Sequence, residues 1–283
     1  MENMFCSEIK SKTLRSPLLV LLLLLVFVVA GCGKTKHEKA LEVAKRLTLT
    51  GSLSDTEAVK SLQQSEKLLN RLVRIKIDAA KWRIRALRRL SEKYIEMGML
   101  ELASKELEKL IDLQPVQPRW YIMKGQLYSR WATVAEDKIS KAERSFQTAL
   151  ELENDSLPAR YGLGVLYAFQ ADRPQRGRQF LRELSFDQRV TNRTRTYVKK
   201  ARFALSRLEF QQGNYRETVR ILREITKMQT LNRDSRFMAY KNLGQVYEQL
   251  SAKEMAIQAY RKANDVYQYD NEVNKALERL SSQ

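Results

Sequence analysis

The feature that most constrains this chain is a small residue that recurs in helical segments of similar pattern. These positions are Ser91, Gly125, Gly164, Ser206 and Gly244, separated by 34, 39, 42 and 38 residues. From about Glu38 onward the apolar residues follow the helical period, and no alternating run typical of strands is present. With only 10 glycines and 5 prolines, the chain has few helix breakers. An all-α chain built from an irregular internal repeat is therefore predicted.

The clearest repeat unit is AYKNLGQVYEQLSAKEMAIQAYRKA, residues 239–263. Two helical faces are marked by Tyr240, Leu243, Gly244 and Tyr247, and by Ala256, Tyr260 and Ala263. This alternation of large, small and aromatic residues resembles the tetratricopeptide repeat, a pair of antiparallel helices A and B. Gly244 and Ala256 are small enough to let the two helices approach, and Tyr247 and Tyr260 are expected to fill the space between them.

Four further segments follow this pattern with varying completeness: 87–115, 121–149, 163–180 and 205–225. The second holds about five extra residues, expected to lengthen its helices or the turn between them. In the third, the small position of helix B falls at Arg176 or Gly177, so this unit is degenerate. The resemblance covers about 87–270. It implies a right-handed superhelical solenoid of antiparallel helix pairs with a concave face, in which each pair packs only against its neighbours.

The N-terminal stretch Val29-Ala30-Gly31-Cys32-Gly33-Lys34-Thr35 admits two interpretations. Gly33-Lys34-Thr35 matches the end of a phosphate-binding P-loop, but the first glycine of that motif is replaced by Val28. The alternative is a secretory signal, with basic residues before residue 17 and an apolar core over 18–30. Val29 to Cys32 resembles a lipobox, in which the cysteine is lipidated. The lipoprotein interpretation is favoured, because the apolar core is too short to span a bilayer.

The predicted organisation has four parts. Residues 1–31 are a lipoprotein signal peptide that is removed, and 32–40 are the lipidated N-terminus and tether. Residues 41–86 form N-terminal helices that could be a degenerate repeat. Residues 87–283 form the solenoid of about five repeats with a C-terminal capping helix. Because Gly33 and not aspartate follows the lipidated Cys32, the outer membrane is favoured over the inner membrane, facing the periplasm.

The composition leaves little for catalysis. The two cysteines are Cys6, in the signal, and Cys32, so no disulfide and no cysteine ligand for zinc is expected in the mature chain. His37 is the only histidine and lies in the tether, which removes the usual base of a nucleophilic triad. We therefore predict no enzymatic activity, no cofactor and no metal site.

The family resemblance implies that helix A lines the concave face, where a partner protein binds. The predicted groove is Arg85, Arg88, Arg89, Arg119, Gln126, Arg130, Tyr161, Phe169, Lys200, Phe203, Arg207, Phe210, Lys241 and Gln245. Arginine and aromatic residues are enriched where proteins bind proteins. An extended or helical segment with acidic and apolar residues would suit this groove. No carboxylate clamp is predicted, because Gln245 stands where the second clamp asparagine belongs.

The chain is strongly basic, with 51 Lys and Arg against 33 Asp and Glu, a net charge of +18. In many proteins such a surplus of basic residues indicates a nucleic-acid partner, but the export signal argues against a nucleic-acid partner here. Residues 173–202 hold ten basic and two acidic residues. This run is either a solvated face or a contact site for anionic lipid, wall polymer or an acidic protein.

Two functional hypotheses follow. The first is a membrane-anchored lipoprotein scaffold in cell-envelope assembly, for outer-membrane proteins, pili or secretins. The second is a cell-wall accessory protein that binds peptidoglycan enzymes or anionic wall polymer through its basic surface. An enzyme with an unusual carboxylate site remains a third, minor hypothesis. The assembly roles rest on analogy of fold.

Overall fold

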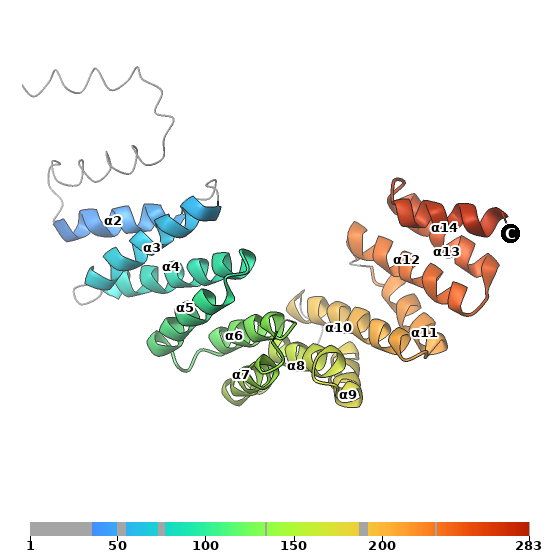
Figure 1. The fold of residues 1–283 in the computed structure, drawn as a ribbon, viewed down its shortest axis with the longest axis horizontal. Helices are drawn as coiled ribbons and strands as arrows, with labels where there is room; N and C mark the ends of the chain where they lie inside the picture. The colour runs from blue at the N-terminus through green and yellow to red at the C-terminus, as the bar shows by residue number, and fades with distance from the viewer. Residues whose placement is uncertain are drawn as a thin grey trace, which may run out of the picture. The chain divides into compact units, whose positions relative to one another are not determined.

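The computed structural model describes residues 36–49, 55–72, 77–133, 135–186, 192–229 and 231–282. These ranges hold thirteen α-helices and no strand, which confirms the predicted all-α fold (Figure 1). None of these helices combines the length and apolarity needed to cross a membrane. The predicted signal peptide, Cys32 and most of the tether lie outside the described residues.

The chain divides into two compact units, Met1–Pro115 and Val116–Gln283. In the first unit, α2 (Lys36–Leu49), α3 (Asp55–Leu72), α4 (Ile77–Glu96) and α5 (Leu100–Leu113) pack in succession, and α2 also touches α4. The helices α2, α3 and α4 enclose Leu41, Ala44, Leu69 and Ala86. The unit thus begins with one helix pair before the predicted repeats, and α4 begins at Ile77, ahead of the repeat boundary predicted at residue 87.

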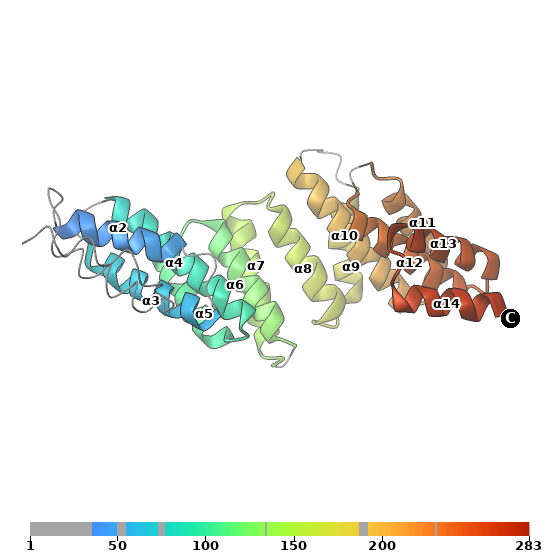
Figure 2. The same ribbon diagram turned by 90° about the horizontal axis from the view of Figure 1, so that it is seen from above.

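The second unit is a succession of helix pairs (Figure 2). Its helices are α6 (Pro118–Trp131), α7 (Lys138–Leu152), α8 (Leu157–Phe169), α9 (Pro174–Ser185), α10 (Asn192–Gln211), α11 (Tyr215–Thr226), α12 (Arg233–Gln249), α13 (Lys253–Val266) and α14 (Asn271–Ser282). Each helix packs on the next one, and α8 also contacts the A helices α6 and α10. This is the predicted tetratricopeptide-type solenoid of antiparallel helix pairs.

Left-handed residues end most of the A helices. Gly98 and Gly213 have φ of 74° and 76°, and each lies in the turn that joins an A helix to its B helix. Asp172 and Ser251 take similar values of 47° and 54° in the corresponding turns. L side chains rarely adopt this conformation. Its recurrence at the same place in four repeats indicates that the four turns share one tight geometry. The α6–α7 connection is longer, so the extra residues of that unit lie between the two helices.

The predicted small positions are sites of close helix contact. Phe146 of α7 lies between Gly125 of α6 and Gly162 of α8, where an added Cβ would stand 2.6 and 2.4 Å from the ring. A Cβ on Gly244 would stand 2.5 Å from the Tyr260 ring. In the degenerate unit the small position is Gly177, since a Cβ there would meet the Ala168 backbone at 2.4 Å. Side chains at these positions would force the helices apart.

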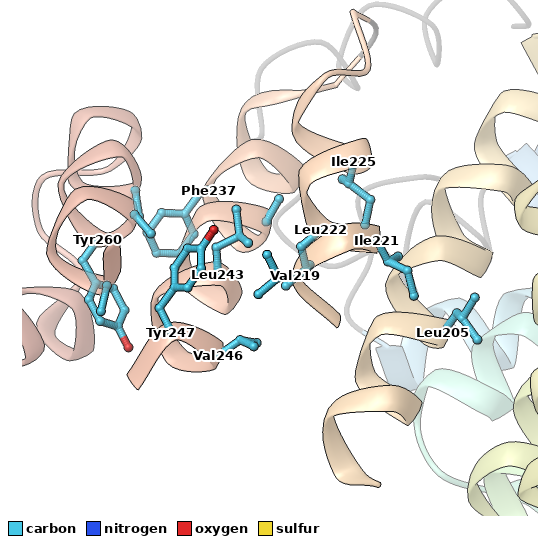
Figure 3. Close-up of a cluster of buried hydrophobic side chains, with 14 of the residues drawn as sticks. Leu205, Val219, Ile221, Leu222, Ile225, Phe237, Leu243, Val246, Tyr247 and Tyr260 are labelled. Carbon is cyan, nitrogen blue, oxygen red and sulfur yellow. The ribbon is translucent and has the colours of Figure 1, made fainter. Parts of the chain in front are cut away.

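The core of the second unit is continuous from α9 to α14. Leu205, Leu222, Leu243 and Tyr247 are among its buried residues (Figure 3). The hydroxyl of Tyr260 donates to Glu248 Oε1 at 2.6 Å, so burial and this bond together raise the pKa of the Tyr260 phenol. Its ring therefore packs in the core while its oxygen remains bonded. The last helix, α14, buries Val273, Ala276 and Leu280 against this core and exposes polar residues on its other side.

Candidate protein-interaction groove

A cavity of about 710 Å³ lies between α8, α10, α11 and α12 of the second unit. Because helical side chains three or four residues apart share a face, each A helix contributes a row of side chains to it. The lining residues, which define the groove, are Tyr161, Val165, Phe169, Lys199, Lys200, Phe203, Ala204, Ser206, Arg207, Phe210, Thr218, Leu222, Asp234, Ser235, Met238, Asn242, Gln245 and Val246. The groove is thus formed mainly by three consecutive A helices.

Aromatic rings dominate the α8 and α10 side of the groove. Tyr161 and Tyr197 meet edge to face with ring centroids 6.1 Å apart. Burial raises the pKa of both phenols above the ordinary value of tyrosine. Both hydroxyls therefore stay protonated at neutral pH and remain hydrogen-bond donors. Tyr161, Phe169, Phe203 and Phe210 line the cavity as an apolar wall that needs little ordering on binding, and Tyr197 packs against Tyr161.

Positive charges lie on these rings. The Arg207 guanidinium stands 4.7 Å from the Phe169 ring centroid, and Lys200 Nζ stands 5.3 Å from that of Tyr197 and 6.0 Å from that of Tyr161. Neither Arg207 nor Lys200 forms an ion pair with a described residue, and neither does Lys199. Contact with an aromatic ring stabilises a cation but does not neutralise its charge. The groove therefore keeps a positive potential that a ligand can use.

The carboxylate of Asp234, the only acidic residue of the groove lining, is bound by another residue. The hydroxyl of Tyr267 donates to Asp234 Oδ1, and this hydrogen bond raises the pKa of the Tyr267 phenol. In contrast, the side-chain amides of Asn242 and Gln245 have no hydrogen-bond partner among the described residues. These two amides lie on one face of α12, where each can both donate to and accept from a ligand.

Half of the predicted groove residues lie together in this cavity: Tyr161, Phe169, Lys200, Phe203, Arg207, Phe210 and Gln245. Lys241 does not line it, because its ammonium binds Asp270 Oδ1 at 3.2 Å and Glu272 Oε2 at 2.7 Å. These two contacts attach α12 to the start of α14. Although burial alone would lower the pKa of Lys241, the two carboxylates raise it.

The other predicted residues lie elsewhere. Arg119, Gln126 and Arg130 are exposed on α6, and the Arg119 guanidinium stands 5.6 Å from the centroid of the Trp120 ring. In the first unit, Arg85 stands 5.1 Å from the Trp82 ring centroid, and Arg88 forms an ion pair with Glu92 at 3.4 Å. Arg89 is partly buried on the same helix, α4. None of these six residues is among those that line the groove.

The predicted groove lacks several residues that line the cavity, among them Lys199, Ser206, Asp234, Met238 and Asn242. It also lacks Tyr197, which packs against Tyr161. Tyr197 precedes Lys200 by one helical turn, and Met238 precedes Asn242 by one turn. A face-by-face extension of the predicted rows along α10 and α12 would have included both. The sequence assigns Ser206 to helix packing alone, because its position in the repeat is the small one.

Most of the described charges of the basic run 173–202 have internal partners. Arg173 Nη1 lies 3.3 Å from Glu143 Oε2, Arg182 binds Glu217 at 3.7 Å, and Arg202 donates to the Ser185 carbonyl at 3.2 Å. The first contact links the start of α9 to α7 and the second links α9 to α11, which are B helices of consecutive repeats, and the third links α10 to α9. The prediction that the run forms a contact site for an anionic surface remains a prediction, and part of the run, 187–191, lies outside the described residues.

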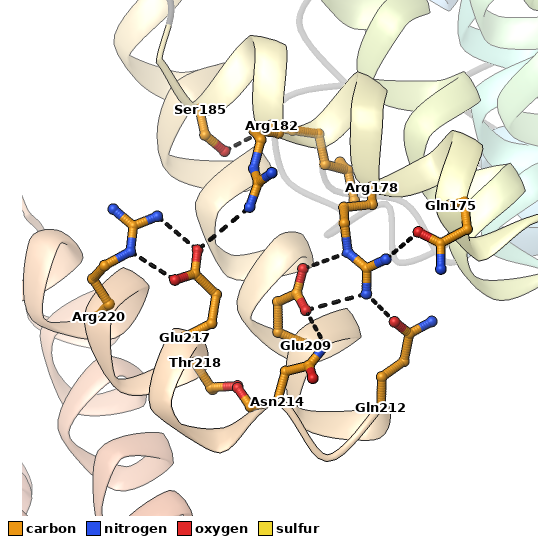
Figure 4. Close-up of polar contacts among 11 residues, drawn as sticks. Gln175, Arg178, Arg182, Ser185, Glu209, Gln212, Asn214, Glu217, Thr218 and Arg220 are labelled. Carbon is orange, nitrogen blue, oxygen red and sulfur yellow. Dashed lines mark hydrogen bonds and ion pairs between the residues drawn. The ribbon is translucent and has the colours of Figure 1, made fainter.

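One of these arginines forms a buried ion pair behind the groove (Figure 4). Arg178 of α9 binds Glu209 of α10 through Nε at 2.6 Å and Nη2 at 3.2 Å. The Glu209 side chain is 3% exposed and also accepts from Asn214 Nδ2 at 2.7 Å. Gln175 and Gln212 accept further hydrogen bonds from Arg178. This network fixes α10, whose opposite face supplies Phe203 and Arg207 to the groove.

In the part of the chain that the structure describes, no group of three or more His, Cys, Asp or Glu is placed to hold a metal ion. The buried carboxylate Glu209 is bound to arginine and asparagine. Glu143 accepts from the Tyr167 hydroxyl at 2.7 Å, and burial together with this bond raises the pKa of Tyr167 to about 12. Both carboxylates thus contact side chains of neighbouring helices.

Comparison with known proteins agrees with this geometry. The family model for the tetratricopeptide repeat matches residues 203–270, which include α11, α12, α13 and most of the groove. No curated protein sequence matches the chain. Residues 203–270 thus carry tetratricopeptide repeats, and the helix pairs of the chain have the fold of that family. Proteins of the tetratricopeptide family generally serve as protein–protein interaction scaffolds without enzymatic activity.

Solved structures support the fold. PilW, titled a widely conserved type IV pilus biogenesis factor, is similar with a TM-score of 0.55 and 17% identity, over 70% of this chain and 88% of that chain. BtubC from P. vanneervenii is similar with a TM-score of 0.62 and 14% identity, over 76% of this chain and 91% of its own. At such low identity the likeness concerns the fold alone.

Proposed function

We propose that this protein is a bacterial lipoprotein scaffold that faces the periplasm and holds envelope proteins in its groove. In this proposal Cys32 carries the lipid, and the tether that follows it joins the membrane to the helical units. The outer membrane is the favoured location because Gly33 follows Cys32. Several acyl chains would hold the protein firmly, since each buried CH₂ contributes about 0.8 kcal/mol.

The observation that carries the scaffold part of the proposal is the groove. It offers a cavity of about 710 Å³ with aromatic walls, cations without ion-pair partners and unbonded amides, and no metal-binding group is found among the described residues. These are features of a surface that binds polypeptide. The envelope part is supported by the order of basic segment, apolar core and lipobox-like cysteine at the N-terminus.

Assembly of pili, secretins or outer-membrane proteins is the pathway class that we propose. PilW is a type IV pilus biogenesis factor by its title, and its similarity to this chain is a similarity of fold. The wall-binding hypothesis has less support. It relies on the basic surplus, and several arginines of the densest basic run are bound to Glu143, Glu209 and Glu217.

The cysteines offer a matched test of the anchor. Cys32→Ala should abolish labelling by a palmitate analogue and move the protein from the membrane fraction to the soluble fraction. Cys6→Ala should change neither result, because Cys6 lies in the segment that we expect to be removed. Affinity purification of the wild type from solubilised membranes should recover envelope-assembly proteins. Unchanged labelling and location in Cys32→Ala would contradict the anchor.

A further inference from the structure

The side chains of the groove limit the class of partner that it can bind. Its volume, about 710 Å³, falls in the roughly 300–1,000 Å³ range of ligand pockets. That space accommodates one or more apolar side chains of a bound segment. The walls toward α8 and α10 are aromatic, and Met238 of α12 faces them with 45% of its surface exposed. Aromatic and methionine surfaces favour an aromatic or long aliphatic side chain as the buried anchor.

The charges of the groove select the residues that flank this anchor. Lys199, Lys200 and Arg207 line it without a carboxylate partner among the described residues, whereas Asp234 accepts a hydrogen bond from Tyr267. Lys200 and Arg207 are exposed, so a carboxylate of a bound segment can reach both, and a segment that covers the groove strengthens this attraction by excluding water. Asp or Glu beside the anchor would therefore be favoured, and Lys or Arg would be repelled.

The polar residues of α12 distinguish a polypeptide from a lipid. Asn242 and Gln245 present amides that lack hydrogen-bond partners among the described residues, opposite the aromatic wall. The main chain of a bound segment supplies N–H and C=O groups that can pair with these amides. One side of the segment would then face the amides, and the other side would face the rings. An acyl chain supplies no such groups and would leave both amides unpaired.

The geometry points to a specific occupant: an acidic segment of a partner protein whose aromatic or long aliphatic side chain enters the cavity between α8, α10 and α12. Its carboxylates bind Lys200 and Arg207, and its main chain bonds Asn242 and Gln245. This inference rests on the proposed scaffold function and adds the chemistry of the partner. It also places the binding site in the second unit, to which Arg85, Arg88 and Arg89 do not belong.

Two methionines provide a matched pair of variants. Met238 lines the groove, whereas Met255 lies on α13 outside it, and their exposed fractions are 45% and 44%. Met238→Glu adds a negative charge facing the cavity, and Met255→Glu adds the same charge elsewhere. Since both side chains are partly exposed, both variants should fold, which circular dichroism would verify. The double variant Lys200→Glu/Arg207→Glu reverses the charge of the groove itself.

The test is selection from a random-peptide library on the full-length protein in detergent micelles, followed by affinity measurement with the best peptide. The wild type should enrich peptides that combine an aromatic or aliphatic residue with adjacent Asp or Glu. Met238→Glu should weaken binding about tenfold or more, and Met255→Glu less than about twofold. Lys200→Glu/Arg207→Glu should enrich basic peptides instead. Binding should weaken as salt is added.

Three results would overturn the inference. They are enrichment of neutral or basic peptides by the wild type, equal weakening by Met238→Glu and Met255→Glu, or displacement of the peptide by vesicles of anionic phospholipid but not by neutral vesicles. The last result would make lipid the occupant. None of these binding measurements depends on the membrane anchor. If Cys32→Ala failed to change the location of the protein, the inference about the groove would therefore still hold. Conversely, an anchored scaffold could bind segments of other chemistry.

Discussion

Replacement of Glu209 by Gln should destabilise the protein, because it removes the charge of a buried carboxylate. Glu209 accepts two hydrogen bonds from Arg178 and one from Asn214, and its side chain is 3% exposed. Breaking a buried ion pair by removing one charge costs roughly 3–5 kcal/mol, because the other charge stays buried. Arg178 is 17% exposed and retains Gln175 and Gln212 as acceptors. We therefore expect a loss of about 2–3 kcal/mol.

Urea unfolding followed by circular dichroism measures this loss, with the m-value checked for constancy. The control is Glu217→Gln, since Glu217 pairs with Arg220 and Arg182 at a more exposed position. It should cost about 0–1 kcal/mol. Replacing both Arg178 and Glu209 by apolar residues should cost less than the sum of the single changes. A Glu209→Gln loss no larger than that of Glu217→Gln would refute this account of the α9–α10 junction.

Three further predictions concern the helix packing. Gly177→Ala should destabilise by about 1–3 kcal/mol in urea unfolding, because its Cβ would meet the Ala168 backbone at 2.4 Å; wild-type stability would contradict the assigned close contact. Gly213→Ala has open space around its Cβ but a φ of 76°, so we expect a loss of about 1 kcal/mol, and a gain would contradict the left-handed turn. The raised pKa of Tyr167, about 12, means that its contribution to stability is complete below pH 10 and is lost as pH rises through 12. Tyr167→Phe should remove one late-titrating phenol from the absorbance titration, and an unchanged titration would contradict the bond to Glu143.

The repeat architecture was predictable because it depends on residue size at fixed spacing. Gly125 and Gly244 are small for a reason that sequence periodicity reveals: a ring of the partner helix occupies the space of their side chains. Gly177 is small for a related reason, since the Ala168 backbone of the partner helix occupies the space of its side chain, although the sequence leaves Arg176 as an alternative. Gly162 was not predicted, because it contacts Phe146 of the preceding repeat and not its own B helix. Contacts between repeats depend on helix angles that a residue pattern does not define.

The groove was predictable only in part. The rows on α8 and α10 follow directly from the helical period, so Tyr161, Phe169, Phe203 and Arg207 were found together. Lys241 of α12 is also predicted to line the groove, but its carboxylate partners, Asp270 and Glu272, lie at the start of α14, some thirty residues later in the chain. Long-range ion pairs of this kind decide which cations remain unpaired. The sequence alone supplies the residues and not their pairing.

The measurement that tests the central claim most directly is photo-crosslinking in cells from the full-length protein. A photoreactive amino acid at Phe203 would lie in the groove, and one at exposed Arg261 on α13 would lie outside it. The account predicts that Phe203 yields discrete adducts with envelope proteins, attached to acidic segments that carry an apolar residue, and that Arg261 yields few. Protein adducts from Arg261 but none from Phe203, or adducts from Phe203 with lipid alone, would contradict the claim that this groove binds partner proteins.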